Sequence, residues 1–285
     1  MKRKLVATAA ILAATVFLAG NAKAKPVIGL DMTGSGGPYT YSDLWTNLTD
    51  TGLSSGYMTG LTIPPTPAYT TTFTYQARIG ALTNGGSVVT PAGLNSSNQL
   101  TLTLAAPETV TAEGRYTDGL GRVHEFANFS SGPNPSALAN VYADKSGAPA
   151  NPNVVSGYTA GVNVLSAHVW NITSSFDEIL TGSGAGTGTG SFSAAFLINT
   201  ANSAYIDLSN FRNRLFDIES TGTTNIPSFY SPTTMWNGTP TSTGTKLKVD
   251  SSESFSAVPE PSTLLLTGSG LLGFAGYGFA RRKKG

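Results

Sequence analysis

Residues 72–80 read TFTYQARIG and alternate strictly between apolar and polar side chains. The apolar members are Phe73, Tyr75, Ala77 and Ile79. A period of two predicts a half-buried β-strand, with one face on a core and the other in solvent. Residues 99–105, 109–116 and 246–250 repeat the pattern. This kind of alternation, more than any other feature of the body, indicates the fold class.

The stretches around these runs predict the rest of the body. Residues 162–172 and 192–198 are apolar on both faces, which is typical of central strands. Residues 105–108 (AAPE) lie between two alternating runs and predict a hairpin connection, while TGSGAGTGTG at residues 181–190 predicts a flexible loop. Only residues 208–216 favour a short helix. Many short strands with turn signals between them predict an all-β body, arranged as a β-sandwich or jelly roll.

The first residues have the pattern of an export signal. Lys2, Arg3 and Lys4 precede an apolar run over residues 5–19, and Ala22-Lys-Ala24 follows it. A basic segment, an apolar segment and an A-x-A site together predict a secretory signal peptide. We therefore expect residues 1–24 to be removed, with Ala22 and Ala24 forming the cleavage site and residues 25–257 forming the exported body.

The last residues predict a membrane segment. Residues 264–280 contain no charged side chain, and Arg281, Arg282, Lys283 and Lys284 follow directly. A helix over residues 264–280 would span about 25 Å, close to the ~30 Å hydrocarbon core of a bilayer. The positive-inside rule keeps residues 281–285 in the cytoplasm. The prediction is a single transmembrane helix with a basic stop signal.

Residues 258–263 precede that helix as VPEPST. Two prolines around one glutamate favour an extended, accessible segment. This box, the apolar stretch and the basic end, in that order over residues 258–285, resemble the PEP-CTERM sorting domain of Gram-negative bacteria. The resemblance implies that exosortase, a membrane protease, recognises Val258, Pro259, Glu260 and Pro261 and then releases or re-anchors the protein. The box would be a substrate site rather than a catalytic one.

A second resemblance concerns the body. Residues 73–77 (FTYQA), residues 177–182 (DEILTG) with the Gly/Thr run after them, and residues 191–193 (SFS) are similar to secreted PEP-CTERM proteins linked to bacterial flocculation. This resemblance implies an extracellular matrix, floc or biofilm component. Exopolysaccharide is then a candidate partner of the body.

Charge and composition exclude several classes of function. Residues 25–257 carry nine Lys and Arg against 15 Asp and Glu, a net charge of about −6, so no nucleic-acid partner is expected. The chain has no cysteine, which excludes disulfides, thiol catalysis and Cys-ligated metals. No sequence motif for a cofactor or a metal site is present, and none is predicted.

Few residues suggest catalysis. His124 and His168 are the only histidines, and His168 shares a predicted central strand with Trp170, as a packed core histidine would. His124 lies near Asp118 and could serve as an acid or base, but it lacks a partner at motif spacing. Residues 52–56 match G-x-S-x-G without its strand–turn–helix setting, which predicts a loop. We therefore expect no enzymatic activity; the alternative is a secreted polysaccharide or ester hydrolase that uses His124 or His168.

Binding surfaces offer a further alternative. Aromatic rings in polar stretches could stack on sugars or could pack at the edge of the core; these are Tyr39, Tyr41, Trp45, Tyr57, Tyr230 and Trp236. Asp177 and Glu178 could bind calcium weakly or form a solvated turn. The threonines at positions 101, 103, 109 and 111 could form an exposed hydroxyl array of the kind that binds ice, although β propensity also explains them.

Overall fold

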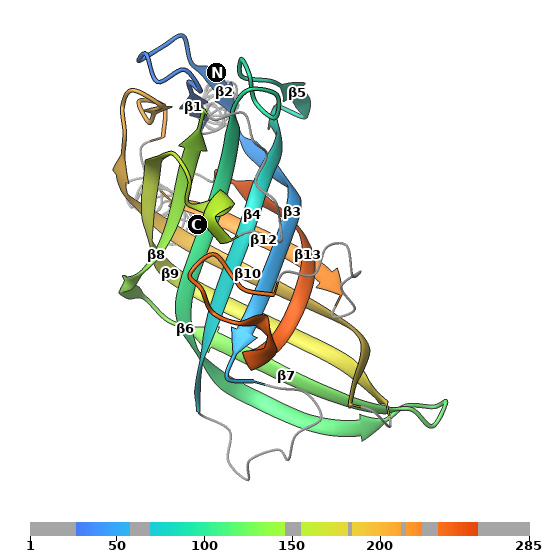
Figure 1. The fold of residues 1–285 in the computed structure, drawn as a ribbon. Coiled ribbons are helices and arrows are strands. Elements are labelled where there is room, and N and C mark those ends of the chain that lie inside the picture. The colour runs from blue at the N-terminus through green and yellow to red at the C-terminus, as the bar shows by residue number, and fades with distance from the viewer. Residues whose placement is uncertain are drawn as a thin grey trace, which may run out of the picture.

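The computed structural model describes residues 27–57, 69–145, 155–181, 184–211, 215–223 and 233–255. Strands dominate this part (Figure 1), and its helical elements are the short 3₁₀ turns η1 (Val155–Tyr158) and η3 (Thr241–Thr243). The all-β prediction is confirmed. No helix within these ranges is both long and apolar enough to cross a membrane. The predicted signal peptide (1–24) and sorting tail (258–285) lie outside the described residues.

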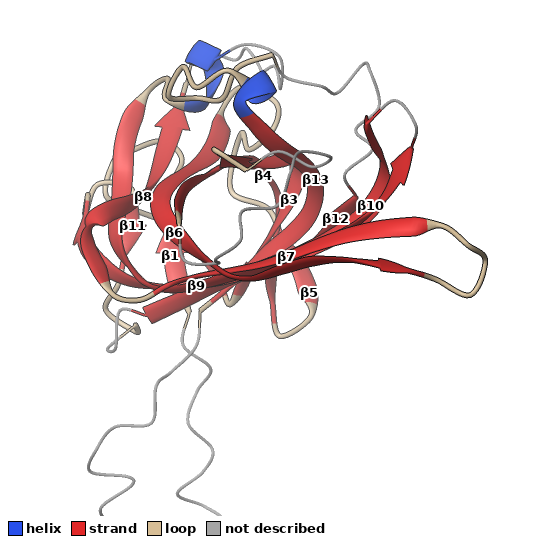
Figure 2. Ribbon diagram, turned by 90° about the horizontal axis from the view of Figure 1, so that it is seen from below, coloured by secondary structure: helices blue, strands red, loops and turns tan. Residues whose placement is uncertain are grey.

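The long strands form one sheet that closes on itself. They are β3 (Leu44–Ser55), β4 (Thr70–Asn84), β6 (Gln99–Thr117), β7 (Val123–Ser131), β8 (Asn134–Asp144), β9 (Val162–Thr181), β10 (Gly184–Ala201), β12 (Leu215–Thr223) and β13 (Gly244–Ser254). Pairing runs β4-β3-β13-β12-β10-β9-β7-β6, all antiparallel, and β6 then pairs back onto β4. The short β5 (Ser87–Val89) pairs with β4. Figure 2 shows the strands encircling a central region.

This closed sheet replaces the two stacked sheets that the sequence predicted. The strands are longer than the alternating runs suggested, since β6 has 19 residues and β9 has 20. Register shifts interrupt the β9–β10, β3–β13, β3–β4 and β6–β7 ladders. Such irregularities bend a strand and increase its twist, and long twisted strands curl a sheet until its edges meet.

Two strands share one position in the ring. β8 pairs with the first half of β6 and of β9, and β7 pairs with their second halves. The predicted hairpin at residues 105–108 is wrong, because β6 continues through it while passing from β8 to β7. Pro107 lies in the interval between the β8 and β7 pairings, where neither of those two strands needs its missing N–H, and on the other side of β6 it is in register with Thr72 of β4.

The inward-facing side chains fill the ring with an apolar core. Phe73, Tyr75, Ala77 and Ile79 are all buried, as the alternation predicts. A three-stranded sheet of β1 (Ile28–Leu30), β2 (Thr40–Ser42) and β11 (Ile206–Asp207) adds Ile28, Leu30 and Ile206 to the core. Just after β13, Phe255 packs its ring against Trp45, Phe211 and Phe216, with centroids 4.9, 5.7 and 6.0 Å away.

Part of the outer face is covered by other segments. The Trp236 backbone N–H donates to Gln76 Oε1 (2.8 Å), and its indole N–H donates to the Leu104 carbonyl (3.3 Å). Thr101 Oγ1 donates to the Tyr158 carbonyl at 2.8 Å. Residues 155–158 and 233–243 therefore lie over β4 and the first half of β6. Thr101 and Thr103 are buried beneath them, so the prediction of an exposed array at these threonines is wrong.

Three local predictions also change. Residues 184–190 belong to β10 rather than to a loop, because their glycines allow close approach between backbones. A Cβ on Gly188 would lie 2.4 Å from the Asp177 carbonyl oxygen. Residues 52–55 of the G-x-S-x-G match lie in β3 and not in a loop. A short helix was predicted over 208–216, and the described part of that stretch contains none: residues 208–211 form a turn that buries Phe211, and β12 begins at Leu215.

Candidate functional site

The outer face of β7, β9, β10 and the second half of β6 carries small polar side chains. Across the ladders, Asn128 pairs with Ser175, which pairs with Ser191; one row away, Ser130 pairs with Thr173, which pairs with Ser193. Neighbouring strands lie about 4.8 Å apart, so these groups form a regular grid. We call this surface the hydroxyl face; its members are Thr111, Asn128, Ser130, Thr173, Ser175, Ser191 and Ser193.

The hydroxyl face contains a shallow groove of about 360 Å³. Its lining consists of the seven members with Phe129 and Ser174, so none of the lining residues is charged. Ser175 Oγ and Ser191 Oγ lie 3.2 Å apart across the β9–β10 ladder. Hydroxyl and amide groups both donate and accept hydrogen bonds. The groove can therefore bind a neutral polar ligand but supplies no charge for catalysis.

An exposed indole lies at one end of this face. Trp170 on β9 is 53% exposed, the largest exposure of any tryptophan in the described residues. The β9–β10 register skips here, because Asn171 pairs with Ala195 but Val169 pairs with Phe196. This irregularity leaves Trp170 as an extra residue and turns its side chain outward. The sequence placed Trp170 in a strand that is apolar on both faces and so missed it as a binding candidate.

The rings that the sequence singled out lie elsewhere. Trp45 and Tyr57 are 1% and 3% exposed, so they are core residues. Trp236 is half-buried in the segment that covers β4 and β6. Tyr39 and Tyr41 are half-buried near β2, where their hydroxyls donate to the Ser203 carbonyl and to Asp207. Tyr230 lies outside the described residues.

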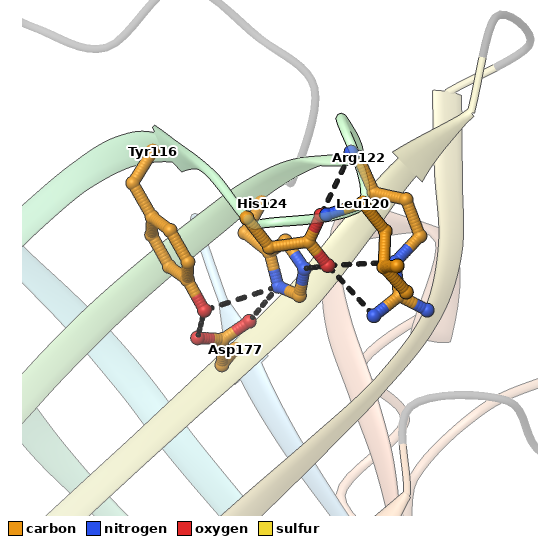
Figure 3. A network of polar contacts seen from close by, with 6 residues as sticks. Tyr116, Leu120, Arg122, His124 and Asp177 are labelled. Atoms are coloured by element: carbon orange, nitrogen blue, oxygen red, sulfur yellow. Dashed lines mark hydrogen bonds and ion pairs between the residues drawn. The ribbon is translucent and has the colours of Figure 1, made fainter.

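A cluster of polar and aromatic side chains lies at the other end of the face (Figure 3). His124 Nδ1 lies 2.6 Å from Asp177 Oδ1, and the Tyr116 hydroxyl donates to Asp177 Oδ2 at 2.7 Å. The Tyr116 ring stacks on the His124 ring, with centroids 4.6 Å apart. The cluster thus connects β6, β7 and β9, and it brings together Asp177 and His124, which the sequence considered separately.

The second nitrogen of His124 faces another carboxylate. Asp118 Oδ2 lies 3.3 Å from His124 Nε2 and also accepts from the Arg122 guanidinium at 2.7 Å. Asp118 Oδ1 accepts the backbone N–H groups of Leu120 and Arg122, both at 2.9 Å. The hydrogen bond to Asp177 is the main reason that the pKa of His124 is raised, and the backbone N–H of Arg122 is the main reason that the pKa of Asp118 is lowered.

This geometry favours a doubly protonated His124 that donates from both nitrogens. A ring held between two carboxylates has no lone pair with which to accept a proton, so it is unsuited to general-base catalysis. His168 on β9 is half-buried, and its Nδ1 is buried without a hydrogen-bond partner among the described residues. His124 pairs with Ile179 near the end of β9, whereas His168 lies near its start, so the two histidines are far apart along the strand.

Other ionisable groups are inside the ring. Glu108 is 1% exposed and accepts from Ser174 Oγ at 2.8 Å, and burial raises its pKa to about 7. Ser54, the central residue of the G-x-S-x-G match, also hydrogen-bonds Glu108 and is buried with it. Within the described ranges, no group of three or more acidic or histidine side chains is placed to hold a metal ion.

Comparison with known proteins concerns the C-terminal end. Residues 257–284 match the model of the PEP-CTERM protein-sorting motif, in agreement with the resemblance seen at residues 258–285. None of the curated proteins compared with the chain matches it. The sorting motif implies export, processing by the membrane protease exosortase, and delivery to the cell surface. The chain thus carries the PEP-CTERM protein-sorting motif after an all-β body.

Proposed function

We propose that this protein is a non-enzymatic component of the extracellular matrix that holds exopolysaccharide at the cell surface. The observation that carries the proposal is the sorting motif at residues 257–284, because this motif implies that the all-β body is exported to the cell surface. The uncharged hydroxyl face gives that body a surface suited to sugar hydroxyls. A protein that retains polysaccharide at the cell surface would have a structural or adhesive role in a floc or biofilm.

The arrangement of the candidate catalytic groups supports a non-enzymatic body. His124 is held between Asp118 and Asp177, and Ser54 is buried beside Glu108. Hydrolysis by a serine requires an accessible hydroxyl next to a base that can accept its proton. A panel of chromogenic glycosides and esters, tested on the wild type and on His124→Ala and His168→Ala, separates the two functions. Turnover that is lost in either variant would favour the hydrolase.

The proposal is tested in the native host by deletion of the gene and by fractionation. We expect the protein in the matrix fraction, with a C-terminus near residues 259–263 by mass spectrometry, and weaker cell aggregation after deletion. The matched control is Glu260→Ala, which alters the sorting box and leaves the body unchanged. It separates the effect of sorting on aggregation from the effect of the body itself. Unaltered aggregation in the deletion strain, together with no polysaccharide bound to the purified protein, would contradict the proposal.

A further inference from the structure

We infer that the hydroxyl face binds one uncharged polysaccharide chain along β9, with Trp170 stacked on a sugar ring at one end and Tyr116 near the other. The inference rests on the proposed function and adds the binding surface and the chemical class of the ligand. It depends on three features of the described residues: an exposed indole, a neutral groove and their alignment on one strand.

The indole supplies the apolar part of the site. A tryptophan that is 53% exposed on a long strand leaves a large ring in contact with water. Sugar rings have an apolar face of C–H groups, and burial of that face against an aromatic ring is favourable because it removes both from water. The irregularity at Trp170 turns the ring toward the same side of β9 as Thr173 and Ser175.

The groove supplies the polar part and determines the charge of the ligand. Its polar side chains are hydroxyls and one amide, which match the mixed donors and acceptors of sugar hydroxyls. An anionic polysaccharide would find no cation among the lining residues. The body as a whole carries a net charge of about −6, which also disfavours an anionic chain. The complementary ligand is therefore uncharged.

The alignment determines the size of the ligand. Along the outer side of β9 the order is Trp170, Thr173, Ser175 and Asp177, and Tyr116 donates to Asp177 at 2.7 Å. Seven residues of strand correspond to roughly 20 Å. That length suits an oligosaccharide segment of a longer chain better than a single sugar. The hydrogen bonds of His124 to Asp118 and Asp177 would hold the Tyr116 side chain in a fixed position at this end of the face.

Affinity electrophoresis of the mature protein purified from its host tests this inference. The gels contain dextran, a soluble β-glucan or alginate at equal mass, so that two neutral chains are compared with an anionic one. We expect retardation by at least one neutral chain and little by alginate. Trp170→Ala should weaken that binding about tenfold, as truncation of an interface tryptophan often does. Trp170→Phe should retain most of the affinity, and Ser193→Lys, which places a long side chain in the groove, should weaken it.

Val88→Ala is the matched control, because Val88 is 69% exposed on β5, away from the hydroxyl face. Circular dichroism melts check that every variant is folded. The wild type could bind neutral or host polysaccharide while Trp170→Ala and Ser193→Lys bind it equally well. That result would overturn the inference and leave the proposed function standing. Stronger binding to alginate, or thermal hysteresis without polysaccharide binding, would also overturn the inference. Failure of the wild type to bind any polysaccharide, including that of its host, would overturn both.

Discussion

Glu253 on β13 provides the sharpest test of the interior that the structure describes. It is 1% exposed, and burial raises its pKa to about 8. Its Oε1 accepts from Asn47 Nδ2 at 2.7 Å, while its Oε2 has no hydrogen-bond partner within the described residues. The negative charge of Asp50 raises the pKa of Glu253 further. The folded state therefore favours the protonated carboxyl over the carboxylate.

The pH dependence follows from the direction of this change. The folded pKa lies above the ordinary value of 4.5, so the contribution to stability is complete below pH 4.5 and is lost as the pH rises through about 8. The loss is about 1.4 kcal/mol per pH unit, up to about 5 kcal/mol across the whole interval. Glu253→Gln keeps the acceptor for Asn47 and cannot ionise. We expect this variant to lose much less stability between pH 5 and pH 8.5 than the wild type.

Urea unfolding at half-unit steps from pH 5 to pH 8.5 measures the effect. The difference in unfolding free energy between variant and wild type should increase with pH by one to several kcal/mol, on the order of the shift above. Asp207→Asn is the control, because hydrogen bonds from Tyr41 and Ser209 lower the pKa of Asp207 from its ordinary value of 3.8. Its contribution is lost only at more acid pH, so this variant and the wild type should have parallel profiles from pH 5 to pH 8.5. Parallel pH profiles for Glu253→Gln and the wild type would refute this account of the interior.

Three further predictions follow from other parts of the chain. Alanines at residues 259–261 should abolish C-terminal processing and retain the intact tail in the membrane fraction; normal processing by mass spectrometry would show that the box is not recognised. Gly188→Ala should destabilise the fold by about 1–3 kcal/mol in urea unfolding, because its Cβ would meet the Asp177 carbonyl oxygen 2.4 Å away, and Gly119→Ala, which meets nothing within 4 Å, is its control. The raised pKa of His124 means that its contribution is complete at acid pH and is lost as the pH rises through that pKa. After correction for intrinsic rates, the amide hydrogen exchange of residues 116–124 should therefore increase with pH. This increase should be larger in the wild type than in His124→Ala.

The sequence predicted the fold class well because its evidence is local. The alternation at residues 73–79 is recognised without knowledge of the rest of the chain, and its apolar side chains are buried as expected. Closure of the sheet depends on the pairing of β6 with β4 and on register shifts in several ladders. Such features have no signature in the sequence, which is why two stacked sheets were the natural prediction.

The candidate site was harder to predict for the same reason. Trp170 is exposed because one extra residue interrupts the β9–β10 ladder, and Thr101 is buried because residues 155–158 cover it. His124 and Asp177 are 53 positions apart and meet only through the pairing of β7 with β9. The glycines at residues 184–190 resembled a linker, whereas close packing of two backbones required them. Small serines spread over three strands become a surface only when the strands are side by side.

The position of Phe255 has a mechanical consequence. The sorting motif follows it directly in the chain, so any tension between the body and an attached C-terminus enters the fold through β13. β13 is paired on both sides, with β3 and with β12. A pull along that strand loads two ladders in shear, so that many hydrogen bonds must break together, and it must also draw the Phe255 ring from between Trp45, Phe211 and Phe216. The pairing of β13 on both sides and the packing of Phe255 thus oppose a pull on the C-terminal end of the body.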